Sequence, residues 1–310
     1  MSRILGFAFP GQGSQSPGML SEHLSQSKEV NQVFDISQEV LGIDFKKLIQ
    51  EGTAEDLSPT QITQPLLLTA NQALWKDLNI KPETVELMAG HSLGEYSAYV
   101  AAESITFEEA LELVSLRAKY MQEAVPEGEG GIAAIIGLSQ DQLLSICNQI
   151  TDSGQLVSMA NLNSENQVVI SGTKEGVDKA IEVCKESGAK RAIPLAMSVP
   201  SHCKLMTPAS QKFSLELDKI NLLPPKTKVI QNFSVSHSDD VQTIKDNLVS
   251  QLYTPVRWFE TMDYFIDAKI TEFYECGPSK VLTGLIKRKF DNVVLNSLDN
   301  YETLNLVKGK

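Results

Sequence analysis

The chain contains 310 residues, of which 42% are hydrophobic and 21% charged, and its formal net charge is −12. This length and composition favour a globular protein with a main domain and a smaller appended one over a disordered chain. The acidic balance argues against non-specific binding of nucleic acid. No apolar segment approaches a signal peptide or a membrane span, so we expect a cytoplasmic protein with no membrane association.

An apolar run over residues 4–9 predicts a buried parallel strand, and residues 10–18 form a loop at its carboxyl end. Loops at this edge of an α/β sheet build active sites. Gly11-Gln12-Gly13 is a poor nucleotide-binding motif, because position 16 is Ser and no Gly-Lys-Ser/Thr follows. We favour instead the backbone N–H of Gln12 as an oxyanion donor. Helices from residue 21 to about 55 and from 63 to about 78 are expected to cover the sheet, with Thr63 as a cap.

The segment Gly90-His91-Ser92-Leu93-Gly94 has the form of a nucleophile elbow, in which a strained Ser lies between two close-packed glycines. An apolar run precedes it, and residues 93–102 follow with helical spacing. The Leu93 N–H is then placed at a helix N-terminus, where it can receive an oxyanion. The turn is expected to aim His91 away from the nucleophile. The alternative is an ordinary turn that carries a Gly-flanked Ser.

Thr106-Phe107-Glu108-Glu109 has the form of a capping box and predicts a helix that contains Arg117 and Met121. From the sequence pattern alone, the favoured interpretation of Arg117 is a solvated or salt-bridged helix charge. The composition changes at residues 126–131, and strands and helices then follow in the order βαββαβ, with a polar connector over residues 162–166 between the second and third strands. This order is typical of a ferredoxin-like unit, so we predict a small inserted domain over residues 127–197 and a core domain over residues 1–126 and 198–310.

Among the four histidines, His202 is the best candidate for a general base. It follows Ser198-Val199-Pro200-Ser201, where the chain returns to the core domain, whereas His23 and His237 lie in polar or amphipathic stretches. Nothing marks a lowered thiol pKa at the adjacent Cys203. The four cysteines form no C-x-x-C pair, so we expect reduced thiols and neither a zinc site nor any other metal centre. The last third predicts helices near 244–252 and 279–288 and a strand over 270–276.

Six blocks of this chain, in order, resemble the stand-alone malonyl-CoA:acyl carrier protein transacylases of fatty acid synthesis. They are residues 9–15, 90–96, Arg117 with Met121, 198–203, 251–258 and 277–282. The resemblance implies the fold of that family, which is a hydrolase-like α/β core with a parallel sheet and an inserted ferredoxin-like domain. It also implies malonyl-CoA and an acidic acyl carrier protein as partners, with the coenzyme A thioester as substrate and no bound cofactor.

The resemblance further implies a role for each site residue. Ser92 attacks the malonyl thioester, His202 transfers the proton, and the N–H groups of Gln12 and Leu93 hold the oxyanion. A main-chain carbonyl near Gln251 takes the place of the acidic triad member. Arg117 pairs with the free malonyl carboxylate, which a guanidinium binds through two parallel hydrogen bonds. The remaining matched pocket positions are Met121, His91, Asn161, Asn163, Val199 and Gln251.

Two other functions are open to a chain with these residues. A hydrolase with the same turn would release the free acid, but Arg117 and the lack of a lipase-type acidic triad member disfavour it. A catalytically silent acyl-binding protein would keep the fold, but the intact Ser92, His202, Arg117 and Gln12 disfavour that.

An acidic carrier protein needs a local basic surface on this acidic chain, and the candidates are Lys190, Arg191, Lys287, Arg288 and Lys289. We predict that reversing Lys287 and Arg288 to Glu raises the KM for carrier protein, because two attractive charges become repulsive. Malonyl loading of Ser92 stays intact in the same variant. Steady-state kinetics with varied carrier protein check this, and an unchanged KM removes the patch from consideration.

Overall fold

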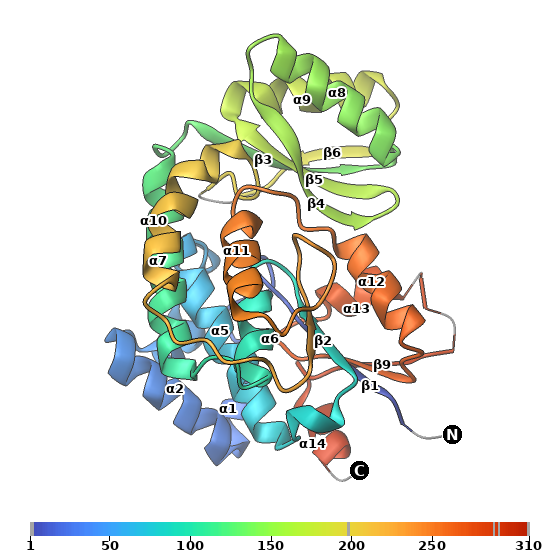
Figure 1. Ribbon diagram of the computed structural model, residues 1–310. Helices are drawn as coiled ribbons and strands as arrows, with labels where there is room; N and C mark the ends of the chain where they lie inside the picture. The colour runs from blue at the N-terminus through green and yellow to red at the C-terminus, as the bar shows by residue number, and fades with distance from the viewer. Residues whose placement is uncertain (1–2, 197–198, 288, 291, 309–310) are drawn as a thin grey trace.

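The computed structural model describes residues 3–196, 199–287, 289–290 and 292–308, and these residues form two separate sheets (Figure 1). In the larger sheet every pairing is parallel and the strand order is β7-β2-β1-β8-β9. Its strands are β1 (Leu5–Phe9), β2 (Leu87–Gly90), β7 (Lys228–Ile230), β8 (Glu272–Glu275) and β9 (Val294–Ser297). The α/β class with a parallel sheet is therefore confirmed.

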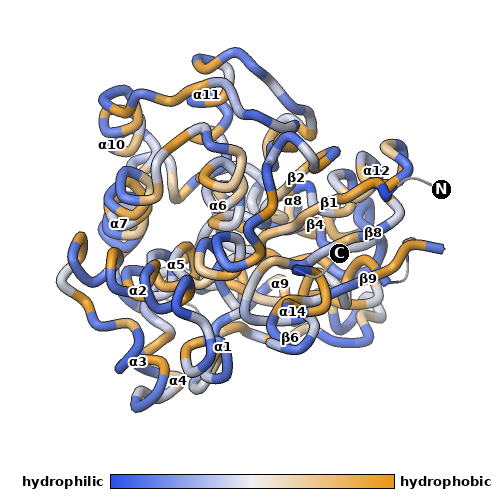
Figure 2. Tube along the Cα trace, turned by 90° about the horizontal axis from the view of Figure 1, so that it is seen from below, coloured by the Kyte–Doolittle hydropathy of each residue, from blue (hydrophilic) through white to orange (hydrophobic). Residues whose placement is uncertain are grey.

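The parallel sheet is buried on both faces, and its side chains alternate between two cores. Phe7 and Phe9 of β1 lie in one hydrophobic cluster, whereas Ala8 between them lies in another. This period of two is the geometry of an extended strand. Helices α2 (Lys28–Leu41), α5 (Thr60–Leu78), α7 (Phe107–Ala124) and α10 (Thr207–Leu217) lie on the first side, and α12 (Trp258–Asp267) lies on the other, as Figure 2 shows. Because both faces of the sheet are covered, the sequences of its strands are almost continuously apolar.

One or more helices follow each strand of this larger unit. They are α1 (Ser21–Gln26), α2 (Lys28–Leu41), α3 (Phe45–Glu51), α4 (Ala54–Leu57), α5 (Thr60–Leu78), α6 (Gly94–Ala101), α7 (Phe107–Ala124), α10 (Thr207–Leu217), α11 (Val241–Gln251), α12 (Trp258–Asp267), α13 (Val281–Ile286) and α14 (Tyr301–Lys308), with short 3-10 turns η1 (Pro82–Thr84) and η2 (Lys204–Met206). The predicted capping box that begins α7 is confirmed at Thr106 and Glu109. Among the described helices, none is long and apolar enough to cross a membrane.

The smaller sheet is antiparallel, with strand order β4-β5-β3-β6. Its elements follow in the order β3 (Gly130–Ile136), α8 (Gln140–Asp152), β4 (Val157–Ser164), β5 (Gln167–Thr173), α9 (Lys174–Glu186) and β6 (Arg191–Pro194). Helices α8 and α9 cover the outer face, and the unit sits on the larger one (Figure 1). It has its own hydrophobic core, separate from the cores of the parallel sheet.

Two local expectations were wrong. The predicted polar connector over 162–166 is mostly strand, because β4 continues to Ser164 and only two residues separate it from β5. Thr63 does not cap a helix, since α5 already begins at Thr60 and the Thr63 hydroxyl donates to the carbonyl of Pro59, four residues earlier. The predicted helical stretch from residue 21 to about 55 is confirmed and consists of four helices, with Ser27 as the N-cap of the second and Gly42 in the left-handed conformation at its end.

The carboxyl ends of β1 and β2 approach so closely that only glycine fits there. A Cβ on Gly90 would lie 1.8 Å from the carbonyl carbon of Gly94, and a Cβ on Gly94 would lie 1.9 Å from the Phe9 carbonyl oxygen. A Cβ on Gly11, in the loop after β1, would lie 2.3 Å from the His91 carbonyl oxygen. Both loops are thereby brought against one another at a single edge of the sheet.

We predict that Gly90→Ala lowers the free energy of unfolding by about 3 kcal/mol or more, because backbone on both sides must move to admit the methyl group. The matched control is Gly284→Ala in α13, where a Cβ meets no atom within 4 Å and φ is not positive. That variant should instead gain about 0.5–1 kcal/mol from its higher helix propensity. Urea unfolding followed by circular dichroism measures both values, and equal effects of the two substitutions would contradict the close-approach argument.

Candidate active site

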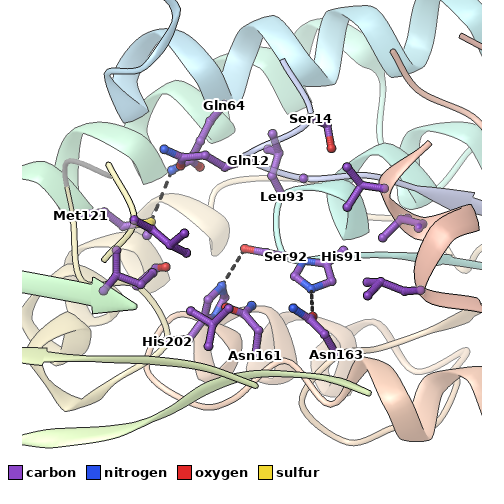
Figure 3. Close-up of a pocket in the computed structure, with 18 of the residues that line it drawn as sticks. Gln12, Ser14, Gln64, His91, Ser92, Leu93, Met121, Asn161, Asn163 and His202 are labelled. Carbon is purple, nitrogen blue, oxygen red and sulfur yellow. Dashed lines mark hydrogen bonds between the residues drawn. The ribbon is translucent and has the colours of Figure 1, made fainter. Parts of the chain in front are cut away.

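Ser92 lies in the turn between β2 and α6, with its backbone in the left-handed region at φ 53°. Its N–H donates to Asn232 Oδ1 at 2.7 Å, which holds this conformation. The Ser92 hydroxyl oxygen lies 2.7 Å from His202 Nε2, so the serine and histidine singled out in the sequence meet (Figure 3). They are 110 residues apart in the chain.

The neighbours of His202 decide which of its nitrogens carries the proton. Its Nδ1 lies 2.8 Å from the backbone carbonyl oxygen of Gln251, which can only accept a hydrogen bond. The proton is therefore assigned to Nδ1, and Nε2 is left to accept from the Ser92 hydroxyl. The His202 backbone, at φ 61°, is tied by its N–H to the Leu252 carbonyl at 3.1 Å. Burial, helped by the positive charge of Arg117, lowers the pKa of His202 to about 3, so its imidazole is a neutral base at physiological pH.

Arg117, from the middle of α7, is the third group at the site and is only 1% exposed. Its Nη2 lies 3.3 Å from the Ser92 hydroxyl oxygen and donates to Gln251 Oε1 at 2.9 Å, and its Nη1 donates to Gln64 Oε1. It forms no ion pair with any carboxylate in the described ranges, and its Nε has no hydrogen-bond partner there. Burial lowers the pKa of this guanidinium. A buried cation beside a nucleophile, bound only by neutral acceptors, is suited to receive an anionic ligand.

A pocket opens around Ser92 between the two units. Residues of the loop after β1, the turn after β2, α5, α7, α13 and the antiparallel sheet line it, among them Gln12, Gln64, His91, Leu93, Met121, Asn161 and Asn163. Met121 lies 3.5 Å from Gln64 through its sulfur. His91 does turn from the Ser92 hydroxyl: its Nε2 lies 2.9 Å from Asn163 Oδ1, as the close-up shows (Figure 3).

The remaining predicted residues do not line the pocket. Val199 is buried in the main core. The Gln251 side chain contacts Arg117 and the Ser92 carbonyl oxygen but is not on the pocket wall. Lys190, just before β6, Arg191 at its start and Lys287 after α13 are exposed. Lys289 is instead tied to Asp263 at 2.7 Å and to the Phe259 carbonyl at 2.6 Å. Arg288, and Met197 and Ser198 before Val199, lie outside the described residues.

Sequence reasoning missed three polar residues that hold the site together. Gln64 binds Arg117, Asn232 binds the Ser92 N–H, and Glu95 binds the side chain of Gln251. Glu95 lies within the segment that carried the serine motif, and its acidic side chain on an otherwise apolar helix was a usable signal. Gln64 and Asn232 stand in segments with no pattern that distinguishes them.

Comparisons with known proteins agree with this geometry. Residues 6–307 match the acyl transferase domain family. The malonyl CoA-acyl carrier protein transacylase of Salmonella typhimurium is 47% identical over 300 residues, which cover 96% of this chain and 97% of that protein. The Bacillus subtilis enzyme of the same name is 43% identical over 306 residues, or 99% and 96% of the two chains.

Solved structures give the same result. The malonyl CoA-acyl carrier protein transacylase of Coxiella burnetii superposes with a TM-score of 0.95 at 44% identity, and covers 100% of this chain and 98% of its own. A malonyl-transacylase solved in complex with a type II PKS acyl-carrier protein also gives a TM-score of 0.95 at 44% identity, with 99% of both chains covered. This chain belongs to the malonyl CoA-acyl carrier protein transacylases, within the acyl transferase domain family.

Proposed function

We propose that this protein transfers a malonyl group from coenzyme A to the thiol of an acyl carrier protein, in fatty acid synthesis, through a malonyl ester of Ser92. The observation that carries the proposal is that the Ser92 hydroxyl oxygen contacts both His202 and Arg117. The Ser92 hydroxyl lies 2.7 Å from a neutral imidazole and 3.3 Å from a buried guanidinium. The first contact provides a nucleophile with its base, and the second provides a partner for a carboxylate on the acyl group.

In the first half-reaction, the Ser92 oxygen bonds to the thioester carbonyl carbon while its proton passes to His202 Nε2. The carbonyl electrons move to oxygen and give a tetrahedral oxyanion. When this collapses, the carbon–sulfur bond breaks and the coenzyme A sulfur takes the proton from His202. The Gln251 carbonyl keeps the imidazole oriented throughout, since it holds Nδ1 at 2.8 Å.

The N–H groups of Leu93 and Gln12 are the proposed donors to the oxyanion. Leu93 follows the nucleophile directly at the start of α6, and the close approach at Gly11 brings the loop of Gln12 against the same turn. Neither N–H donates a hydrogen bond elsewhere within the described chain. Each donor in such a site is worth about 3–4 kcal/mol of barrier.

In the second half-reaction the phosphopantetheine thiol of the carrier protein attacks the malonyl ester and gives its proton to His202. The Ser92 oxygen leaves and takes that proton back, so the enzyme returns to its starting state. Two acyl transfers through one covalent intermediate produce ping-pong kinetics. Besides the protein, the steps require only the coenzyme A thioester as donor and the phosphopantetheine thiol as acceptor.

Arg117 is proposed to select the acyl group. The malonyl carboxylate is one methylene from the thioester carbonyl, so it must lie close to Ser92 when the carbonyl is attacked. A guanidinium forms two parallel hydrogen bonds to a carboxylate, and this one is already desolvated by burial. His91, Asn161, Asn163 and Met121 shape the surrounding wall.

The finer classification of the fold belongs to the same proposal. The antiparallel order β4-β5-β3-β6, with two helices on one face, supports a ferredoxin-like domain at about residues 127–197, inserted in a hydrolase-like core. The left-handed φ of Ser92 and the crowding at Gly90 and Gly94 support a nucleophile elbow.

The exposed cations support a docking surface for an acidic carrier protein. Lys190 and Arg191 lie on the small unit, and Lys287 follows α13, which lines the pocket. Lys289 contributes less to this surface, because Asp263 already neutralises it. Four buried free cysteines support a reducing compartment such as the cytoplasm.

The proposed function predicts one covalent adduct. Intact-protein mass spectrometry after incubation with malonyl-CoA should show the mass of a single malonyl group, and Ser92→Ala should show none. Addition of a carrier protein that bears phosphopantetheine should remove the adduct and place the malonyl group on the carrier. Rapid release of free malonate without any acceptor would instead support a hydrolase, and no adduct on the wild-type protein would overturn the proposal.

Arg117→Met should lower kcat/KM for malonyl-CoA about 100-fold, because charge-assisted hydrogen bonds worth about 3 kcal/mol are lost. Loading from acetyl-CoA should not fall, since that acyl group has no carboxylate. The matched control is Lys119→Met on the same helix, where an exposed side chain is replaced and both rates should stay unchanged. Initial rates of Ser92 acylation with each thioester check this, and an equal loss for both substrates would contradict the assigned role.

A further inference from the structure

Glu95 in α6 is a buried carboxylate that the steps above do not use. It is 0% exposed and forms no ion pair with any residue of the described ranges. Its Oε2 accepts from the Asn232 N–H at 3.0 Å and from Gln251 Nε2 at 2.7 Å. Burial raises the pKa of this carboxyl to about 7, against the opposing effects of those donors and of Arg117. A carboxylate kept in the interior without a contacting cation costs free energy, so its position calls for a reason.

The Gln251 side chain connects Glu95 to the reacting groups. Its Nε2 donates both to Glu95 and to the Ser92 carbonyl oxygen, at 3.0 Å for the latter. Its Oε1 accepts from Arg117 Nη2 at 2.9 Å, and its backbone carbonyl faces His202. One amide therefore lies between a carboxyl oxygen that accepts its hydrogen bond and a guanidinium that can only donate one.

The two ends of an amide have nearly the same shape but opposite hydrogen-bonding character. If the Gln251 amide were turned by half a rotation, its NH2 would meet the guanidinium N–H groups, and its oxygen would meet the Glu95 carboxylate and the Ser92 carbonyl. All three contacts would then be repulsive. Glu95, as an acceptor beside Nε2, makes the observed orientation the favoured one.

We propose that Glu95 is a positioning residue, which fixes the Gln251 amide so that its oxygen holds the Arg117 guanidinium in place for the acyl carboxylate. The same Oε2 secures the other side of the turn. It holds the backbone of Asn232, whose side chain accepts the Ser92 N–H at 2.7 Å and donates to the Gly90 carbonyl at 2.6 Å.

The consequence is specific to the acyl group, and it rests on the proposed function. Without an acceptor at position 95, the Gln251 amide can turn and Arg117 loses a fixed partner. Substrates with a carboxylate then bind a less ordered site, whereas the Ser92–His202 pair keeps its own contact through the backbone of Gln251. Loss of Glu95 should therefore affect malonyl transfer more than acetyl transfer.

The test compares Glu95→Leu with Glu95→Gln. The leucine variant removes the acceptor, and we expect its KM for malonyl-CoA to rise about 10-fold while acetyl loading and the labelling of Ser92 by a fluorophosphonate change less than about threefold. The glutamine variant retains a carbonyl oxygen that can accept both hydrogen bonds, and it should stay within about threefold of wild type in KM. If the leucine variant does not fold, Glu95→Asp, which withdraws the carboxylate by one methylene, serves with the same expectations.

The matched control is Asp77→Leu, which removes another buried carboxylate, bound to Ser27 at 2.7 Å and Lys308 at 2.6 Å at the far end of α5. It should lower Tm without changing the ratio of malonyl to acetyl loading. The proposal is overturned if Glu95→Leu behaves in the same way, or if it leaves the KM for malonyl-CoA unchanged.

A spectroscopic readout keeps the test independent of the reaction. In 15N-labelled wild-type protein the Gln251 side-chain NH2, assigned by its loss in Gln251→Leu, should exchange slowly with solvent because both protons are held. Exchange should be faster in Glu95→Leu and restored in Glu95→Gln. Unchanged exchange in Glu95→Leu refutes the positioning role. Failure of the wild-type protein to accept a malonyl group, with the exchange pattern as expected, refutes the proposed function alone.

Discussion

A positive charge buried without an ion pair is the constraint on which this site depends. Arginine side chains stay protonated in proteins. Burial lowers the pKa of Arg117, but its guanidinium keeps its charge, so the surrounding chain must solvate it. Gln64 and Gln251 supply neutral acceptors, and the Tyr96 ring lies with its centroid 5.3 Å from the guanidinium carbon. These partners are weaker than a carboxylate. In the proposed function, the solvation free energy of Arg117 that these partners do not restore is recovered when a malonyl carboxylate binds.

The second constraint is backbone strain, which among the described non-glycine residues that line the pocket is confined to Ser92 and His202. Ser92 and His202 both adopt left-handed conformations, and each such non-glycine residue costs about 1–3 kcal/mol. Each is held by a hydrogen bond from its own N–H, to Asn232 and to the Leu252 carbonyl respectively. The strained turns point the two side chains at one another, so the proton-transfer distance is set by the fold.

The parts of the site that follow local rules could be predicted from the sequence. The glycines around Ser92 revealed a turn that admits no side chain, and the capping box at Thr106 fixed the start of the helix that carries Arg117. His202 emerged only by elimination among four histidines, because its partner is 110 residues away. The sequence pattern did not assign a function to Arg117. Only the resemblance to a family whose substrate carries a carboxylate implied one.

The rest could not be predicted, because it depends on contacts between distant segments. Gln64 and Asn232 are ordinary amides in their local sequence, and their importance arises from where the fold brings them. The polar run at 162–166 was assigned to a connector because strands favour apolar residues. In the structure its first three residues belong to β4, where the polar side chain of Asn163 lines the pocket.

Strand β4 is hydrogen-bonded to the larger unit and also lines the pocket, so both units contribute to one site. The Leu162 N–H donates to the Val256 carbonyl at 2.8 Å, and the Val256 N–H donates to the Ala160 carbonyl at 2.8 Å, so this strand is bonded to the larger unit. Asn161 and Asn163 then line the pocket, while Leu162 between them enters the core of the small unit. A register shift of one residue would exchange these faces and place leucine where asparagine now meets His91. The polar wall opposite Ser92 is therefore specified by the register of one strand against a segment about 95 residues later.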